Sequence, residues 1–246
     1  MNKNFWTQRV KDYGHTGWSD NITYLYDQYL RLHLIEKVVN KYFVSNQIKY
    51  SLDYGCGSGD FTKLLAQYSE KTLGVDIAQE IIDVASKKNR EENITFMQLD
   101  NLDYSPSKYS LVNSITVLQH ILKDDELNIV LNKLNTILSK KGIFIIVDSY
   151  GENQESEYMK LRKYEDFILL LKQNNFNVLE THNLYHPQEE PTKLFKLYSR
   201  SIVIRILNRL KFVKVLASIA KFISSYDSPL VISNATTKLT VAQKAV

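Results

Sequence analysis

Short apolar runs alternate with amphipathic stretches through the middle of the chain. The run Gly142–Asp148 (GIFIIVD) is typical of a strand buried on both faces. Apolar positions between such runs recur at helical spacing. Strands alternating with helices predict an α/β fold with a doubly wound, mostly parallel, seven-stranded sheet and right-handed crossovers. Strands are expected at 50–54, 71–76, 94–99, 109–116, 142–148, 176–184 and 237–242, and helices at 61–68, 79–89, 126–138 and 162–173.

Two further segments are expected to add helices to this sheet. Ser19 is expected to be the N-cap of a long helix that ends near Phe43. Residues 198–223 separate near Lys211 into two short amphipathic helices with different apolar faces. The chain is therefore expected to form a single domain, with an N-terminal helical cap at 1–47, a cofactor-binding core at 48–184, a helical insertion at 185–226 and a final strand at 227–246.

Composition narrows the class of protein and its setting. The chain has 246 residues, 44% of them hydrophobic and 24% charged, which suits one well-packed core. Cys56 is the one cysteine, so neither an intramolecular disulfide nor a cysteine-type zinc site is expected. Neither a secretory signal nor a run long enough to cross a bilayer is visible. A reducing, cytoplasmic setting is the default expectation.

The net charge of +4 hides a local excess of positive charge. Between Thr192 and Tyr226 there are eight basic residues and no acidic ones, so the rest of the chain sums to −4. Three interpretations are open: a lid over an acceptor that carries phosphate or carboxylate, a peripheral contact with the inner face of a membrane through 198–223, or a homodimer face or plain surface. Because the positive charge is confined to this one segment, it does not favour a nucleic-acid partner.

A glycine-rich turn follows the first expected strand. In SLDYGCGSGDF, Gly55, Gly57 and Gly59 allow a sharp turn and a close approach of backbone to a ligand, and a helix begins directly afterwards. Asp53 lies two residues before the first glycine, close enough to meet a ligand ammonium group. The G-x-G-x-G spacing differs from the G-x-G-x-x-G of dinucleotide enzymes. Cys56 is interpreted as a small residue filling the turn.

The stretch DYGCGSG closely resembles the first motif of the class I S-adenosylmethionine-dependent methyltransferases. The resemblance covers about residues 50–150 and implies S-adenosyl-L-methionine as cofactor. In GVDIA, it implies that Asp76 accepts hydrogen bonds from the ribose hydroxyls and that Ile77 packs on the adenine. In QLDNLDY, Asp100 would accept from the adenine amine and Asn101 would lie beside the ring. In SITVLQHI, the strand would end under the methionine moiety at Thr116 and Val117.

His120 follows that strand and is the candidate catalytic residue. A histidine there could take a proton from an O–H or N–H acceptor, or it could only shape the pocket. Asp148 ends the next strand and is a candidate for binding the acceptor. No metal is expected, because residues 116–120 offer no carboxylate. Three further candidates for the acceptor pocket precede the core, where relatives place a flap: Tyr13, His15 and Trp18.

These residues favour an enzyme that moves a methyl group to a small-molecule, glycan-precursor or lipid-linked acceptor by O- or N-methylation. The alternative is a non-catalytic binding or scaffold protein that keeps the fold, although its expected mark, decay of the glycine loop, is absent. A nicotinamide oxidoreductase is disfavoured by the glycine spacing and by the lack of a Tyr-x-x-x-Lys pair on a mid-chain helix.

Overall fold

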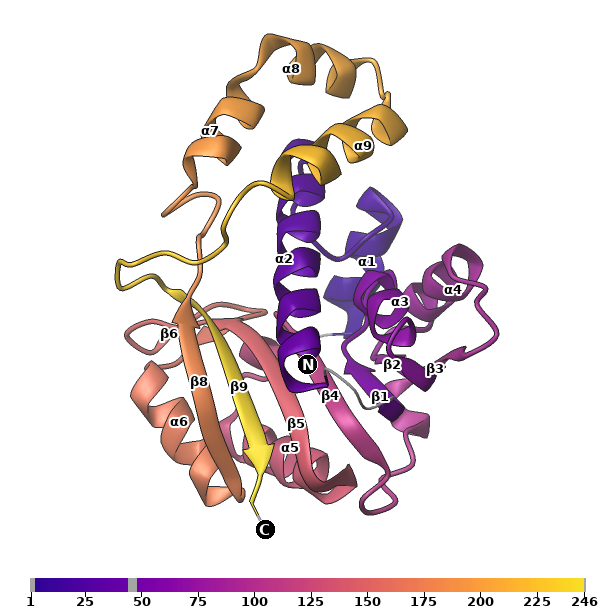
Figure 1. Ribbon diagram of the computed structural model, residues 1–246, viewed down its shortest axis with the longest axis vertical. Coiled ribbons are helices and arrows are strands. Elements are labelled where there is room, and N and C mark those ends of the chain that lie inside the picture. Colours follow the sequence, from indigo (N-terminus) through magenta and orange to yellow (C-terminus); the bar gives the residue numbers. More distant parts are fainter. Residues whose placement is uncertain (1–2, 44–47, 246) are drawn as a thin grey trace. The chain divides into compact units, whose positions relative to one another are not determined.

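The computed structural model describes residues 3–43 and 48–245, and these fall into two compact units (Figure 1). The sheet unit comprises the described residues of 1–16, 45–182 and 237–246, and the helical unit those of 17–44 and 183–236. The N-terminal segment expected to form one cap is thus divided between the units. Residues 44–47, at the expected end of that cap, lie outside the described residues.

The sheet unit is built on seven strands in the order β3-β2-β1-β4-β5-β9-β8. The pairs from β3 to β5 are parallel, and β9 runs antiparallel to β5. The expected doubly wound, mostly parallel sheet is confirmed. The strands are β1 (Ile48–Tyr54), β2 (Ser69–Asp76), β3 (Ile94–Gln98), β4 (Tyr109–Ile115), β5 (Leu138–Ser149), β8 (Phe176–Asn183) and β9 (Thr237–Lys244).

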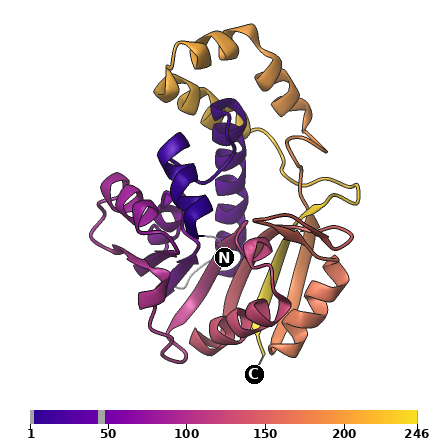
Figure 2. The same cartoon turned by 180° about the vertical axis from the view of Figure 1, so that it is seen from behind.

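Helices cover both faces of this sheet (Figures 1 and 2). Right-handed crossovers place α3 (Asp60–Ala66) and α4 (Gln79–Lys88) on one face, since both lead the chain toward β3. Helices α5 (Asp124–Ile137) and α6 (Tyr164–Gln173) share an apolar cluster with Phe144 and Ile146 of β5. Because alternate residues of a strand point to the same face, α5 and α6 cover one face together.

The strand order reverses between β1 and β4, and ligands of open α/β sheets bind at such a point. The register aligns the carboxyl ends of four strands there. Asp53 of β1 pairs with Gly74 of β2 and with Asn113 of β4, and Asp76 pairs with Gln98 of β3. Side chains that end these strands are therefore brought to one edge of the sheet.

Several short elements of the sheet unit were not predicted from sequence. Helix α1 (Lys3–Tyr13) packs against α4, and Thr7 Oγ1 donates a hydrogen bond to Glu80 at 3.0 Å. A hairpin of β6 (Gln154–Glu155) and β7 (Lys160–Leu161) follows β5. Two 3₁₀ turns, η1 (Leu99–Asn101) and η2 (Leu118–His120), follow β3 and β4.

The helical unit contains α2 (Asn21–Tyr42), α7 (Lys193–Arg200), α8 (Ile202–Arg209) and α9 (Val213–Ser224). The expected N-cap at Ser19 is wrong by one residue, because the Asp20 carboxylate accepts from the Thr23 N–H at 2.8 Å. Three helices stand where two were expected. The expected phase break is confirmed at Lys211, whose φ of 58° lies outside the helical region. The core of the unit comprises Tyr26, Leu30, Tyr185, Phe195, Tyr198, Ile204, Leu216 and Ala220.

A buried carboxylate joins distant parts of the helical unit. Asp27 of α2 accepts hydrogen bonds from Arg31 at 3.0 Å, from Tyr185 at 2.9 Å and from the Trp18 indole at 3.0 Å. Since Asp27 and Arg31 are both 7% exposed, their charges are paired where water is largely excluded.

Within the described parts of the chain, no helix is long and apolar enough to cross a membrane.

Candidate active site

The glycine loop joins β1 to α3 in a conformation that requires glycine. Gly55 and Gly57 have φ values of 82° and 50°, a region in which side chains with a Cβ are strained. A Cβ built on Gly57 would meet a single atom within 4 Å, the Thr16 Oγ1 at 2.8 Å. The loop therefore presents bare backbone on this side, and Gly59 follows as the N-cap of α3.

Asp76, which ends β2, faces this loop. One carboxylate oxygen accepts from the Gly57 N–H at 3.0 Å and the other from the Ile77 N–H at 2.7 Å. Burial raises the pKa of Asp76, and the backbone N–H groups of Gly57, Ile77 and Ala78 oppose that rise. The carboxylate thus stands directly beside the exposed backbone of the turn.

Asp53 lies deeper, at 1% exposure. Its two carboxylate oxygens accept from Thr62 Oγ1 of α3 at 2.7 Å and from Asn113 Nδ2 of β4 at 3.1 Å. Burial raises its pKa to about 6, and both hydrogen bonds oppose the rise. Asp53 therefore joins β1, α3 and β4 beneath the loop, and its contact with a ligand ammonium group stays a prediction.

Cys56 is buried within the turn, and its Sγ contacts the Gly57 carbonyl oxygen at 3.7 Å. Burial raises the pKa of this thiol well above its ordinary value, and the neighbouring carboxylates Asp76 and Asp53 add to the rise. A thiol held neutral is a poor nucleophile, so Cys56 acts here as a small packing residue.

The end of β4 packs directly on the glycine loop. A Cβ on Gly55 would lie 2.3 Å from a methyl group of Val117, so this glycine lets the two segments approach. Thr116 has a φ of 55°, which is uncommon for a β-branched residue. Its N–H donates to Val147 of β5 at 2.6 Å, and its hydroxyl to the Ile115 carbonyl at 2.7 Å. Such backbone strain is concentrated at functional sites.

The candidate adenine-contacting residues lie at the ends of β2 and β3. Ile77 is half-buried, and its carbonyl accepts from Gln98 Nε2 at 3.1 Å. Asp100 and Asn101 of η1 are exposed just beyond β3. Both side chains remain accessible to a ligand, and their roles stay predictions.

His120 is 7% exposed at the end of η2. Its Nδ1 lies 2.7 Å from the Tyr158 carbonyl oxygen, and its Nε2 lies 3.3 Å from Gln119 Nε2. The Gln119 amide is oriented by Ser149, whose N–H donates to Gln119 Oε1 at 2.7 Å. Burial lowers the pKa of His120 to about 4, Arg9 adds to this effect, and the Tyr158 carbonyl opposes it. The ring is therefore neutral at neutral pH.

Aromatic residues that the site prediction omitted surround this histidine. Trp6 meets the His120 ring edge-on at 4.7 Å between centroids, and Tyr158 stacks on it at 5.9 Å. Phe5 stacks in turn on Tyr158 at 4.6 Å. Trp6 also packs against the buried cluster of Val10, Ala78 and Ile81, on which Ile77 packs as well, so it links the His120 side of the site to the region just after β2. The aromatic residues near the N-terminus were the feature of the sequence that could have indicated this contact.

The three flap candidates lie in different places. Tyr13 is 43% exposed, with the Arg9 guanidinium 5.3 Å above its ring. His15 is buried in the sheet unit, one residue before Thr16, which approaches Gly57. Trp18 belongs to the helical unit, where its ring contacts His186. Among these candidates, His15 thus lies next to the residue that borders the glycine loop.

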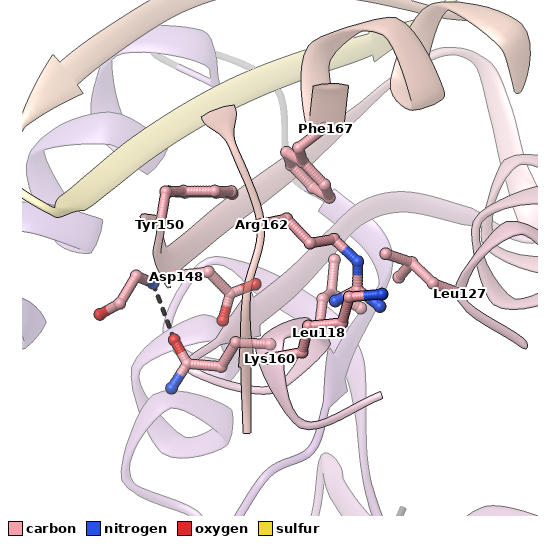
Figure 3. Close-up of a pocket in the computed structure, with 9 residues that line it drawn as sticks. Leu118, Leu127, Asp148, Tyr150, Lys160, Arg162 and Phe167 are labelled. Atoms are coloured by element: carbon pink, nitrogen blue, oxygen red, sulfur yellow. Dashed lines mark hydrogen bonds between the residues drawn. The ribbon is translucent and has the colours of Figure 1, made fainter. Parts of the chain in front are cut away.

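Asp148 is 2% exposed at the end of β5 and lines a small cavity (Figure 3). The cavity measures about 10 Å³, enough for about one water molecule. Figure 3 shows Asp148 between Tyr150 and the Arg162 side chain, with Lys160 below them. Arg162 and Lys160 both pair with Asp124, at 2.7 and 2.8 Å. An acceptor role for Asp148 stays a prediction.

The chemistry of this site suits a cationic ligand. Asp53 and Asp76 are both buried with raised pKa values, and no lysine or arginine is among the groups that shift either one. A ligand with positive charge would stabilise their charged forms. Within the described ranges, no group of three or more histidine, cysteine or acidic side chains could hold a metal ion. Fold and site together define an α/β domain with a candidate ligand site at the carboxyl ends of β1 and β2.

Comparison with known proteins finds a family match over part of the chain. Residues 52–146 match the family model described as "Methyltransferase domain". Over 98 residues the chain is 31% identical to the ubiquinone biosynthesis O-methyltransferase of Coxiella burnetii, a match that covers 37% of this chain and 42% of that protein.

Solved structures with the same fold extend the likeness over most of the chain. One is phosphoethanolamine N-methyltransferase 2 of Haemonchus contortus in complex with S-adenosyl-L-methionine, with a TM-score of 0.61 at 19% identity over 87% of this chain and 53% of that one. The [4+2]-cyclase SpnF superposes with a TM-score of 0.59 at 15% identity over 87% and 81% of the two chains.

The chain spans less than half the length of the Coxiella relative, and the family match lies within the sheet unit. The family match covers less than half of this chain, and the solved structures share its fold. The family match and the shared fold both support the class I methyltransferase resemblance that the motifs predict.

Proposed function

We propose that this protein transfers a methyl group from S-adenosyl-L-methionine to an oxygen or nitrogen atom of a small-molecule, glycan-precursor or lipid-linked acceptor. One observation carries the proposal: the Asp76 carboxylate stands 3.0 Å from the N–H of Gly57, beside bare backbone at the point where the strand order reverses. An acid in this place can turn to ribose hydroxyls while the glycine loop admits the rest of the cofactor.

The cofactor supplies an electrophilic methyl group on a sulfonium centre. In this chain, Asp76 would hold the ribose, Ile77 would pack on the adenine, and Asp100 and Asn101 would border the ring. Thr116 and Val117 at the end of β4 would border the methionine moiety. The raised pKa of Asp53 supports this arrangement, because a nearby cation would favour its carboxylate form.

His120 would meet the acceptor. Its Nδ1 is committed to the Tyr158 carbonyl, so Nε2 carries the lone pair that can accept a proton from an O–H or N–H group. An acceptor that donates to Nε2 would replace the Gln119 amide, whose distance of 3.3 Å indicates a weak hydrogen bond. Trp6 and Tyr158 would exclude water from this point.

The names of the relatives agree with a small acceptor. They describe O-methylation in ubiquinone biosynthesis and N-methylation of phosphoethanolamine. The cyclase with the same fold shows that the fold alone does not specify the reaction, so the alternative of a protein that binds without transferring methyl groups is kept.

Two measurements test the proposal. Calorimetry should show that the protein binds S-adenosyl-L-methionine and S-adenosylhomocysteine. Incubation with methyl-labelled cofactor and fractionated metabolite and lipid extracts should then transfer label to one fraction, and Asp76→Ala should reduce the transfer at low cofactor concentration. Absence of cofactor binding would refute the proposal, whereas binding without transfer to any fraction would favour the non-catalytic alternative.

A further inference from the structure

Helix α8 turns its apolar face to solvent. Ile202, Val203, Ile206 and Leu210 follow the spacing of one helix face, and they are 73%, 58%, 51% and 60% exposed. Ile204 points to the other side and is 4% exposed within the core of the helical unit. The more apolar face of α8 is therefore the one that its own unit leaves uncovered.

The exposed apolar surface continues beyond the helix. Phe212, Val213 and Val215, at the turn into α9, are 51%, 42% and 45% exposed. Helix α9 buries Leu216 and Ala220 in the core of the unit, although Phe222 near its end is 65% exposed. The exposed apolar side chains are concentrated on α8, the middle of three consecutive helices in Figure 1, and at the start of α9. We define residues 202–215 as the α8 surface.

Positive charge surrounds this surface. Arg205 and Arg209 lie one turn apart on α8, beside its apolar face, and Lys211 and Lys214 follow. All eight basic side chains between Thr192 and Tyr226 are exposed. In the part of the chain that the structure describes, none of the eight forms a salt bridge.

We propose that the α8 surface binds an anionic lipid bilayer, with the helix lying in the plane of the interface. The apolar face would enter the boundary between head groups and acyl chains, and the flanking arginines and lysines would contact lipid phosphates. This inference goes beyond methyl transfer and does not depend on it. It concerns the helical unit alone.

The same observations disfavour other occupants. A second copy docked on this face would bring the same eight positive charges against these eight, without an acidic residue between Thr192 and Tyr226 to offset them. A nucleic acid would use the positive charge but would leave the face of Ile202, Val203, Ile206 and Leu210 without a partner. A bilayer with anionic head groups satisfies both the charge and the apolar face.

Sedimentation of the full chain with lipid vesicles tests the proposal. The protein should sediment with vesicles of phosphatidylcholine and phosphatidylglycerol, should stay in solution with phosphatidylcholine alone, and should be released by salt. Arg205→Gln combined with Arg209→Gln should weaken binding about 25-fold, from about fivefold per basic residue. Ile206→Glu should abolish binding. Lys172→Glu and Ile129→Glu, on exposed positions of α6 and α5, should bind like the wild type.

A fluorescent label gives a second readout. Phe212→Cys can be labelled selectively, since Cys56 is buried and its thiol has a raised pKa. A label sensitive to polarity should shift to the blue with anionic vesicles only, and circular dichroism should show that every variant keeps its helices. The readout needs no enzymatic activity, so it is independent of the acceptor.

Four results would overturn the proposal. The first is a lack of sedimentation with anionic vesicles, and the second is equal loss of binding in the control variants. The third is a different partner in the absence of vesicle binding. This partner would be either RNA, bound in a salt-sensitive way, or a second copy of the chain in a dimer that Ile206→Glu dissociates. The fourth is a rise in the KM for the acceptor in the arginine variant, again without vesicle binding, which would identify a lid.

Discussion

Nδ1 of His120 lies 2.7 Å from the backbone carbonyl oxygen of Tyr158. A carbonyl oxygen can only accept, so Nδ1 carries the proton of the neutral ring and Nε2 carries the lone pair. The β6–β7 hairpin, which supplies Tyr158, therefore fixes the tautomer of a histidine that follows β4. Two segments separated by 38 positions in the sequence define the chemistry of one ring.

His120→Ala should lower the turnover of methyl transfer by about 10²–10⁴-fold, the usual contribution of a general base. The affinity for S-adenosylhomocysteine should change by no more than a few-fold, because the proposed cofactor contacts do not include His120. Calorimetry and single-turnover kinetics would separate the two effects. His33→Ala, on α2, is the matched control. Wild-type turnover in His120→Ala would mean that the ring is only a wall of the pocket.

The pKa values of Asp53 and His120 should act in opposite directions on the free energy of unfolding. The pKa of Asp53 is about 6 in the folded protein against an ordinary 3.8, so the folded state binds more protons and stability falls as pH rises through that window. The pKa of His120 is about 4 against an ordinary 6.5, so stability falls as pH drops from 6.5 toward 4. In the wild type, the two effects on the free energy of unfolding therefore largely cancel between about pH 4 and pH 6.

Substitution should remove one effect at a time. Relative to wild type, Asp53→Asn should gain stability as pH rises from 4 to 6, with a slope of about 1.4 kcal/mol per pH unit. His120→Gln should show the opposite slope. Urea unfolding at a series of pH values, followed by circular dichroism, measures both. If the free energy of unfolding depended on pH in the same way in both variants, the pKa values given above would be contradicted.

Sequence reasoning placed the strands of the sheet because buried parallel strands leave a local mark. The run 142–148 is apolar throughout, and it lies within β5. The glycine loop was equally visible, since only glycine tolerates the backbone of Gly55 and Gly57. Such features depend on residues that are adjacent in the chain.

The surroundings of His120 and the helical unit could not be predicted in the same way. Trp6 lies far before His120 in the chain and Tyr158 far after it, yet both rings contact the histidine. A periodic pattern of neighbouring residues does not indicate such long-range contacts. The α8 pattern was visible, but the pattern alone does not tell whether the apolar face is covered. Asp20 replaced Ser19 as N-cap because both residue types serve that role and only geometry selects one.

Asp76→Ala should weaken cofactor binding by roughly 2–3 kcal/mol, the scale of hydrogen bonds to a charged group. The variant would remove the carboxylate that faces the glycine loop, and it would leave the Gly57 N–H without its acceptor. Asp76→Asn keeps the size and should lose less. Asp83→Ala, an exposed acid on α4, should bind like the wild type. Calorimetry with S-adenosylhomocysteine showing equal affinity in all four proteins would refute the ribose assignment.

Gly57→Val should abolish cofactor binding, and Gly14→Val should not. Both glycines have positive φ values, 50° and 74°, so valine at either place should cost roughly 1–2 kcal/mol of stability through backbone strain. They differ in surroundings: a Cβ on Gly14 meets nothing within 4 Å, whereas one on Gly57 lies 2.8 Å from Thr16 Oγ1, next to the N–H that donates to Asp76. Thermal unfolding would confirm that both variants fold. Calorimetry would then measure the effect on the ligand, with Gly14→Val as the control for a valine at positive φ. Normal binding by a folded Gly57→Val would show that the cofactor does not approach this loop, and the site would have to lie elsewhere on the sheet unit.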